Sequence, residues 1–263
     1  MLPEARRRHL LSYLAQVGSA AIVDLSARYH VSSMTIRRDL GKLQGQGLVT
    51  LTHGGVVFDG DAPRQRQTQR LTRDHNRARE KRAIGRHAAT HFVKDNDVLL
   101  LGPGSTVRAL LPFLKRKRNL QLVSNSLRTV ESLRVALPAA TVMGTGGLLR
   151  ADTLNFVGPV TERFFDDFFA RVAFISGAGL SLTAGLTDSH LLEAAAKQAM
   201  IRSAEQTVVL LDSSKFATTA AAQVLAIDQI DAIVTDAGIA PEARSQLVEL
   251  GIDVQVAPLP ALA

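Results

Sequence analysis

The sequence of 263 residues predicts a mixed α/β protein with two parts, an N-terminal winged helix-turn-helix and a larger α/β domain with a mainly parallel sheet. Three observations support this fold class. Three helical segments and a hairpin pattern occupy the N-terminal region, a polar basic stretch follows, and short apolar runs then alternate with helical segments. The predicted boundaries are residues 1–58 for the helix-turn-helix, 59–78 for a basic linker and 79–263 for the α/β domain.

Two helices are expected in the first 30 residues. The first runs from residue 3 to about residue 16, because apolar side chains recur there at helical spacing, and it ends at Gly18. The second is short and covers residues 23–29. Its side chains available for a core are Val23, Leu25 and Ala27.

The third helix carries the clearest pattern of the N-terminal region. It begins at Ser32 or Ser33, which are both good N-caps, and it continues to about residue 46. Ile36, Leu40 and Leu43 fall at positions i, i+4 and i+7, so that one apolar stripe faces inward. The polar residues between them are therefore expected on the other faces.

A β-hairpin is expected after the third helix. Two apolar extended runs, residues 48–51 and 56–58, bracket a turn that contains Gly54 and Gly55. Three helices with a tight turn before the third, followed by a hairpin, are the order of elements in a winged helix-turn-helix.

A winged helix-turn-helix predicts double-stranded DNA as a partner, because only the major groove admits a helix and distinguishes all base pairs. Arginine side chains at the start of the third helix can fork onto guanine or bridge to phosphate. The residues expected to contact DNA are Ser33, Thr35, Arg37, Arg38, Lys42 and, at the tip of the wing, His53. The alternative is an ordinary solvated helix face and a turn histidine, which is the commoner situation for each residue taken alone.

The charge distribution favours the DNA interpretation. Residues 1–86 hold 16 Lys and Arg against 7 Asp and Glu, whereas residues 87–263 hold 15 against 17. A basic N-terminal third indicates a polyanion-binding part joined to a part with another task. Arg6 to Arg8 and the arginines of the linker are expected to add sequence-independent attraction to DNA.

Composition excludes several classes of protein. The chain has no cysteine, which rules out disulfide scaffolds, thiolate catalysis and cysteine-ligated metal sites. No run of about 18 uncharged apolar residues predicts a membrane span, and the first residues do not resemble a signal peptide. We expect a cytoplasmic protein that needs no metal or cofactor and does not bind a membrane.

The α/β domain is predicted from apolar strand-like runs that alternate with helical stretches, the pattern of a mainly parallel sheet. The runs are Asp97–Leu101, Leu120–Ser124, Thr141–Met143, Val172–Ser176, Thr207–Asp212, Ala232–Thr235 and Val254–Ala257. Loops rich in glycine or hydroxyl side chains follow four of them, at residues 102–106, 124–126, 144–147 and 212–215. Ligands of open α/β sheets bind at the carboxyl ends of the strands, so these loops form the predicted ligand site.

The loop at residues 102–106 suits a phosphate group, because its glycines allow close backbone approach and Ser105 and Thr106 supply hydroxyl groups. A plain tight turn is an equally good interpretation of any one of the four loops. A helix opened by Thr187 and Asp188 would carry Glu193 and Lys197 on one face, either at the site or as a surface ion pair. The residues expected to bind an effector are Gly102, Gly104, Ser105, Thr106, Ser124, Asn125, Gly146, Gly147, Lys197, Asp212 and Lys215.

The motifs of both parts resemble those of the DeoR family of bacterial transcriptional repressors. The N-terminal signature of that family is similar to V-S-S-M-T-I-R-R-D-L at residues 31–40 and G-L-V-T-L-T-H-G-G at 47–55. The order G-S-T, S-N-S, G-G, G-L-T, E-A-A-A-K and D-S-S-K resembles the sensor domain of the same family, so the resemblance covers almost the entire chain.

The resemblance implies a sensor domain related in fold to ribose-5-phosphate isomerases and CoA transferases, which binds phosphorylated sugars or similar metabolites. It implies that Gly104, Ser105 and Thr106 hold a phosphate, that Ser124 and Asn125 hydrogen-bond the ligand, and that Lys215 neutralises its charge. Many members have an aspartate just before the first loop, where this chain has Gly102 and Pro103. This departure implies that one sugar hydroxyl contact is missing and that the ligand differs from the commonest ones.

Two function classes remain open at this point. The first is a DNA-binding repressor of sugar or related carbon catabolism genes that acts as a homo-oligomer and is controlled by a phosphorylated sugar-like effector. The second is a sugar-phosphate isomerase-like enzyme that carries a DNA-binding domain, with Asp188, Glu193 or Asp212 as its base. The regulator is favoured because an isomerase would not explain the basic winged helix, and because the loop at residues 176–181 contains no acid.

Overall fold

The structure is a computed structural model that describes residues 3–46, 48–52, 54–58 and 76–259. The chain divides into two compact units, residues 1–73 and 74–263. No helix in the described part of the chain is both long enough and apolar enough to cross a lipid bilayer.

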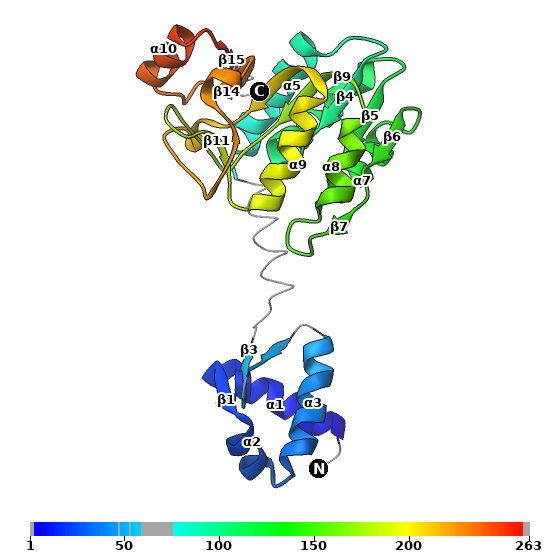
Figure 1. Ribbon diagram of the computed structural model, residues 1–263, viewed down its shortest axis with the longest axis vertical. Helices are drawn as coiled ribbons and strands as arrows, with labels where there is room; N and C mark the ends of the chain where they lie inside the picture. The colour runs from blue at the N-terminus through cyan, green and yellow to red at the C-terminus, as the bar shows by residue number, and fades with distance from the viewer. Residues whose placement is uncertain (1–2, 47, 53, 59–75, 260–263) are drawn as a thin grey trace. The chain divides into compact units, whose positions relative to one another are not determined.

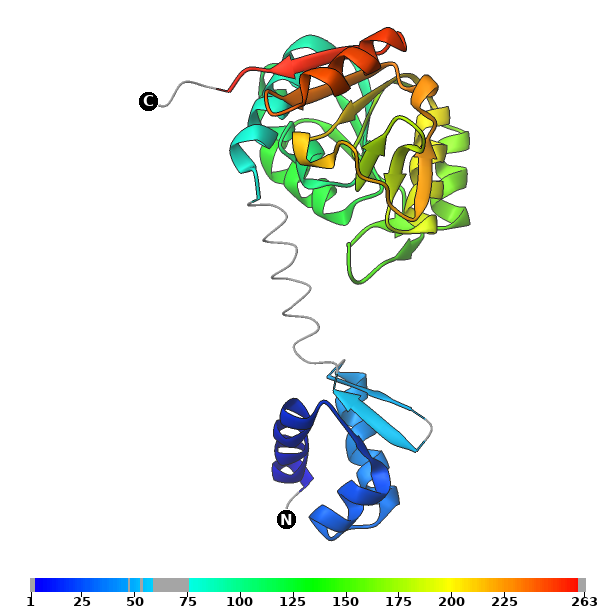
Figure 2. The ribbon, with the colours of Figure 1, turned by 90° about the vertical axis from the view of Figure 1, so that its left-hand side faces the viewer.

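The N-terminal unit contains the three predicted helices and the predicted hairpin. The helices are α1 (Pro3–Val17), α2 (Ile22–Tyr29) and α3 (Ser33–Gly45), and the hairpin strands are β2 (Val49–Leu51) and β3 (Gly55–Phe58). The strands of the hairpin are antiparallel (Figure 2), and Gly54 adopts a φ of 86° in the turn between them. Glycine reaches that conformation without a steric penalty, as the Gly-Gly motif predicted.

A short additional strand was not predicted. β1 (Ser19–Ala21) pairs antiparallel with β3, so the wing is a three-stranded sheet with the order β1-β3-β2. Three residues are too few to show the alternation that identifies a strand in a sequence. The strand ties the start of α2 to the wing, because the Ile22 N–H donates to the Gly54 carbonyl.

The core of this unit follows the predicted helical stripes with one correction. The buried apolar side chains are Leu10, Leu14, Ile22, Leu25, Ile36, Leu40, Leu43, Val49 and Val56. The prediction that Val23 and Ala27 are available for the core was wrong, since Val23 and Ala27 are both exposed and Ile22 is buried instead. Helix α2 begins one residue earlier than predicted, and its buried face therefore contains Ile22 and Leu25.

The larger unit is built on a seven-stranded sheet in which every pair of neighbouring strands is parallel. All seven predicted runs form this sheet, in the order β15-β14-β12-β9-β4-β5-β6. The strands are β4 (Val98–Leu101), β5 (Gln121–Ser124), β6 (Thr141–Gly144), β9 (Ala170–Ile175), β12 (Ala204–Leu210), β14 (Ala232–Asp236) and β15 (Asp253–Ala257).

Helices cover both faces of this sheet. Leu99 and Leu101 of β4 pack into one core, and Leu100 packs into the other, as expected for a strand that is buried on both sides. The first core includes side chains of α5 (Ala78–Phe92), α6 (Ser105–Arg108), the 3-10 helix η1 (Leu111–Arg116) and α7 (Leu127–Ala136). The second includes side chains of α8 (Pro159–Asp166), α9 (Leu191–Arg202) and α10 (Pro241–Glu249), of which α8 and α9 lie side by side in Figure 1.

Two small antiparallel sheets complete the unit and were not predicted. One has the order β10-β11-β13, with β10 (Gly179–Ser181), β11 (Gly185–Asp188) and β13 (Ala222–Leu225). The other pairs β7 (Leu148–Leu149) with β8 (Phe156–Val157). The prediction that Thr187 and Asp188 open a helix was wrong: both belong to β11, and His190 is the N-cap of α9. The His190 imidazole accepts a hydrogen bond from the Leu192 N–H. This capping role is usually taken by Ser, Thr, Asp or Asn, so the sequence did not indicate it.

Candidate functional site

The start of α3 is fixed by a side-chain cap. Ser32 is the N-cap, and its hydroxyl accepts a hydrogen bond from the Thr35 N–H at 3.3 Å. This settles the choice between Ser32 and Ser33, and it places Ser33 in the first turn. The Ser33 hydroxyl donates to the Ser26 hydroxyl of α2 at 3.4 Å, so that α2 and α3 are joined beside the predicted contact surface.

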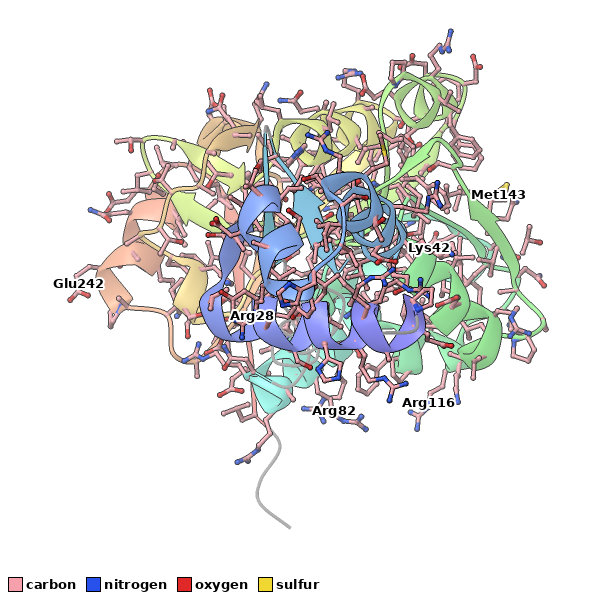
Figure 3. The ribbon with its side chains drawn as sticks, turned by 90° about the horizontal axis from the view of Figure 1, so that it is seen from below. Arg28, Lys42, Arg82, Arg116, Met143 and Glu242 are labelled. Atoms are coloured by element: carbon pink, nitrogen blue, oxygen red, sulfur yellow. The ribbon has the colours of Figure 1, made fainter. Side chains whose placement is uncertain are left out.

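The predicted DNA-contact residues of α3 lie on its solvent side. Ser33, Arg37, Arg38 and Lys42 are exposed and Thr35 is half-buried, whereas the apolar stripe is buried. Lys42 of α3 and Arg28 of α2 are labelled in Figure 3, where both are seen from below. His53 and the linker residues 59–75 lie outside the described residues, so the roles assigned to them stay predictions.

Asp39 of the R-R-D motif does not belong to the solvated face. It is buried, and its carboxylate accepts from the Arg6 Nε at 2.6 Å and from the Arg7 Nη1 at 3.3 Å. Arg6 is itself buried, which corrects the prediction that the cations at residues 6–8 all add sequence-independent attraction. The ion pair instead holds α1 against α3. Sequence spacing does not indicate this contact, because 33 residues separate its partners.

The four predicted ligand loops lie at one edge of the parallel sheet. They follow β4, β5, β6 and β12, and carboxyl ends of parallel strands meet at the same edge. Strand β9 lies between β12 and β4, so its own loop sits in the middle of this edge. The first loop is in contact with it, since the Gly102 N–H donates to Phe174 and a Cβ on Gly104 would lie 3.3 Å from the Ser176 Cβ.

The loop at residues 102–106, which was predicted to suit a phosphate, has one accessible hydroxyl residue and one buried one. Gly104 adopts a φ of 136° and is the N-cap of α6, which is only four residues long. Ser105 is half-buried, while Thr106 and Gly102 are buried. Of the two hydroxyl residues, Ser105 is therefore the better placed to meet a ligand.

The S-N-S loop is almost fully buried. The Ser124 hydroxyl donates to the Leu101 carbonyl at 2.6 Å and accepts from the Ser126 N–H, so it joins the ends of β4 and β5. The Asn125 amide group donates to the Phe156 carbonyl at 3.0 Å. The Asn125 side-chain oxygen has no hydrogen-bond partner within the described structure. A buried acceptor without a donor costs free energy, and a hydrogen bond from a bound ligand would remove that cost.

The loop at residues 144–147, G-T-G-G, is held against α8. Gly146 and Gly147 have φ values of 68° and 110°, which favour glycine. The Thr161 hydroxyl donates to the Gly146 carbonyl at 2.7 Å, and a Cβ on Gly147 would approach that hydroxyl to 2.4 Å. The second glycine is thus required by packing as well as by its backbone conformation.

Glu193 and Lys197 do not form the ion pair that their spacing suggests. Both are buried, and each has other partners. The Lys197 ammonium group donates to the Asp188 carboxylate and to the Ser176 carbonyl, each at 2.5 Å. Burial raises the pKa of Asp188, but the Lys197 charge and hydrogen bonds from Lys197 and Ser189 outweigh it and hold that pKa below its ordinary value.

Glu193 joins α9 to the loop after β7. Its carboxylate accepts from the Thr153 hydroxyl at 2.7 Å and from the Asn155 amide at 2.8 Å, and the Arg150 Nη1 lies 3.6 Å away. None of these partners was predicted. The i, i+4 spacing correctly placed Glu193 and Lys197 on the same part of α9, although their partners come from other strands and loops.

The D-S-S-K loop contains a buried carboxylate that binds an arginine. Asp212 is the N-cap of the 3-10 helix η2 (Ser213–Lys215), and its carboxylate accepts from the Ser214 N–H. The Arg77 Nη1 lies 3.6 Å from the Asp212 Oδ1 and 3.8 Å from the Asp236 Oδ1, and it donates to the Ser213 hydroxyl. Arg77 was not predicted as a site residue, because nothing in the sequence relates it to a loop more than 130 residues away.

Lys215 differs from the other predicted cation of the site. It is half-buried, and it forms no ion pair with any carboxylate of the described residues. Lys197, by contrast, is neutralised by Asp188. Of the two lysines predicted for the edge of the sheet, Lys215 is therefore the one that can bind an anionic group. The carboxylates of Asp188, Glu193 and Asp212 all accept hydrogen bonds from neighbouring side chains or backbone N–H groups. A general base needs a carboxylate that is available to take a proton from the substrate, so these three do not suit that role.

Comparison with known proteins gives matches for both units. Residues 6–61 match the model of the DeoR-like helix-turn-helix domain, and residues 76–237 match the model of the DeoR C-terminal sensor domain. The HTH-type transcriptional regulator YgbI of Escherichia coli is 30% identical over 98% of this chain and 99% of its own length. The HTH-type transcriptional regulator GolR of Listeria innocua is 28% identical over 98% of this chain and its full length.

A solved structure of ribose 5-phosphate isomerase from Plasmodium falciparum matches 52% of this chain and 52% of its own, with 15% identity and a TM-score of 0.39. A similarity of that size supports no statement about activity. The full-length relatives above are named as regulators of transcription.

Proposed function

This chain belongs to the DeoR family of HTH-type transcriptional regulators, and from that premise we propose that it is a repressor controlled by a phosphorylated sugar-like metabolite. The genes it controls are those of sugar or related carbon catabolism. The regulatory ligand binds at the carboxyl edge of the seven-stranded sheet and changes the affinity of the protein for its operator. It acts through its different affinities for the DNA-bound and the free state.

DNA is bound by a homo-oligomer in this proposal. Two or more winged helices contact a repeated operator, since the symmetry of helix-turn-helix proteins matches the repeat of their sites. Arg37 and Arg38 read base edges or the adjacent phosphates from the exposed side of α3. Ser33, Thr35 and Lys42 add contacts along the same helix.

The observation that carries the ligand assignment is Lys215, the half-buried lysine of the edge that has no carboxylate partner in the described chain. Neighbouring strands of a sheet lie about 4.8 Å apart, so the ends of β12 and β4 are separated by about 10 Å across β9. A small phosphorylated metabolite can span that distance, with its phosphate near Lys215 or Ser105. The unpartnered Asn125 oxygen supports a ligand hydroxyl group as donor.

The test is a gel-shift assay with the upstream region of the gene and a panel of sugar phosphates, with inorganic phosphate as reference. The wild-type complex is expected to respond to at least one sugar phosphate. Lys215→Ala should bind the same DNA with unchanged affinity and lose that response. Lys94→Ala, which removes an exposed lysine from the opposite end of the strands, is the matched control and should respond like the wild type. An unchanged response of Lys215→Ala would place the ligand elsewhere.

A further inference from the structure

The positive charge of the larger unit is concentrated in two short segments. Residues 79–96 and 111–118 together hold nine Lys and Arg and two Asp and Glu. The remainder of residues 79–263 holds ten Lys and Arg against sixteen Asp and Glu. A net charge of +7 in these two segments therefore stands against −6 in the rest of the unit. The net charge of the whole unit is therefore close to zero, although these two segments are strongly basic.

The two segments are adjacent in the fold. They form α5 with the turn after it, and η1 with the residues that follow, and α5 packs against η1 in the same core. The Arg82 guanidinium lies over the Phe113 ring of η1, with 5.3 Å between its carbon and the ring centroid. Arg82 and Arg116 project toward the same side in Figure 3. We call this surface the basic face, which consists of Arg79, Arg82, Arg86, Lys115, Arg116, Lys117 and Arg118.

The helical part of the basic face is regular. Arg79, Arg82 and Arg86 are exposed, and their spacing of three and four residues puts them on one side of α5. Lys81, which lies between them in the sequence, is buried. The three exposed arginines therefore form a row along the solvent side of α5, and the buried lysine lies on another side of the helix.

A shallow hollow lies beside this row. It is lined by Ala89, Thr90, Asp95, Phe113, Arg116 and Lys117. Its one carboxylate is already bound, because the Arg118 N–H and Nε both donate to Asp95 at 3.0 Å. The backbone and side-chain hydrogen bonds from Arg118 lower the pKa of Asp95, so it stays ionised and paired. The hollow thus presents cationic and hydroxyl groups that can donate hydrogen bonds to phosphate oxygens.

Most of the cations of the basic face lack a carboxylate. Arg118 is paired with Asp95, but Arg79, Arg82, Lys115 and Arg116 form no ion pair with any residue that the structure describes. Like charges at this density repel one another, and a polyanion that binds them relieves the repulsion. The one phenylalanine beside these cations, Phe113, has the Arg82 guanidinium over its ring. Spaced arginines and lysines of this kind suit a phosphate backbone, which is recognised by charge rather than by base stacking.

We propose that the basic face is a second DNA-contact surface, which binds the phosphate backbone of the duplex independently of sequence. The proposal rests on the proposed function in that it takes DNA as the partner of the chain. It goes beyond that function by assigning part of the DNA affinity to the larger unit, whose other residues carry a net negative charge. The basic face adds affinity and salt dependence, and the α3 residues supply sequence preference.

The test compares full-length wild type with the double variant Arg82→Ala/Arg116→Ala. Operator affinity is measured by fluorescence anisotropy between about 50 and 200 mM salt, a range in which phosphate contacts weaken strongly. Each lost phosphate contact makes the negative slope of log K against log salt shallower by about 0.9. The magnitude of the slope should therefore fall by about 1.8 for each subunit whose basic face contacts the duplex. The ratio of operator to random-DNA affinity should stay unchanged.

The matched control is Arg163→Ala/Arg244→Ala, which removes two exposed arginines from α8 and α10 on the other side of the sheet. It loses the same formal charge and should keep a slope close to that of the wild type. Equal slopes for the wild type and the Arg82/Arg116 variant would overturn the proposal. So would a changed sedimentation coefficient with an unchanged slope, because the face would then be a contact between subunits.

The two proposals fail in different ways. Binding of the wild type to operator and random DNA with equal affinity would refute sequence-specific repression and leave the salt slope measurable on random DNA. A normal operator preference with no contribution from the basic face would refute only the second surface. Circular dichroism spectra of both double variants, compared with the wild type, verify that each is folded.

Discussion

Replacing Lys197 tests whether the buried centre of the ligand edge is structural. Lys197 is the residue whose predicted role and observed surroundings differ most: it was expected to meet an effector, yet its ammonium group already contacts Asp188 and Ser176. The side chains of Lys197 and Asp188 are only 4% and 13% exposed. The substitution Lys197→Met keeps an unbranched apolar side chain, one atom shorter than lysine, and removes the charge and the donors.

The expected loss follows from the carboxylate that the substitution leaves behind. Breaking a buried ion pair by removing one partner costs about 3 to 5 kcal/mol, mostly because the other charge stays buried. Asp188 keeps its hydrogen bond from the Ser189 N–H at 2.6 Å, so we expect the lower end, about 3 kcal/mol. Asp188→Asn should cost a similar amount, and the double variant should cost less than the sum of the two.

Urea unfolding followed by circular dichroism measures these differences. The two units need not unfold together, so hydrogen exchange of the α9 amides assigns the loss to the larger unit. Lys94→Met, at an exposed lysine, serves as the matched control. A loss below about 0.5 kcal/mol for Lys197→Met would place it within the range of ordinary surface substitutions and refute the structural role.

The pH dependence gives an independent check on the same pair. The pKa of Asp188 is lower in the folded protein than its ordinary value, so the stability it contributes is fully present above the unfolded pKa of about 3.9. That contribution is lost as the pH falls through the folded pKa. Wild type should therefore lose more stability in acid than Asp188→Asn does, and parallel pH profiles would contradict the assignment.

Substitutions of Arg37 and Asp39, two positions apart in α3, should affect different properties of the protein. Arg37→Ala removes an exposed side chain and should weaken preference for the operator by about 1 to 3 kcal/mol without changing stability, measured by anisotropy with operator and random DNA. Asp39→Asn leaves the Arg6 guanidinium buried without its carboxylate and should destabilise the N-terminal unit by about 3 kcal/mol, measured by thermal unfolding. Loss of stability in the first variant, or full stability in the second, would reverse these roles.

The main sheet was predictable because its strands are buried on both faces. Such strands appear in the sequence as continuous apolar runs, of which Val98–Leu101 and the first three residues of Ala232–Asp236 are examples. The strands that were missed all lie outside that sheet, and four of the six are shorter than any strand within it. β7 and β8 have two residues each, and β1 and β10 have three, so none extends far enough to show a period of its own.

The position of the ligand loops was predictable for a similar reason. Once the strands are known to be parallel, their carboxyl ends must share an edge, whatever the side chains do. The partners within that edge were not predictable. Lys197 was expected either to meet an effector or to pair with Glu193, four residues away. Instead Asp188, from a strand of a second sheet, accepts from Lys197, and Glu193 accepts from Asn155. Local spacing fixes which face of a helix a residue occupies, and tertiary packing decides what it meets there.

Arg77 connects the ligand edge with the part of the chain that leads to the DNA-binding unit. It adopts a φ of 54°, a conformation that costs a residue with a side chain about 1 to 2 kcal/mol, and it precedes the first residue of α5. Its contacts with Asp212, Asp236 and Ser213 hold this backbone in place. Under the proposed function, a ligand bound at Lys215 would alter the same loop that anchors Arg77. A displacement of that loop would therefore act directly on the start of α5, the helix that carries the basic face and follows the predicted linker.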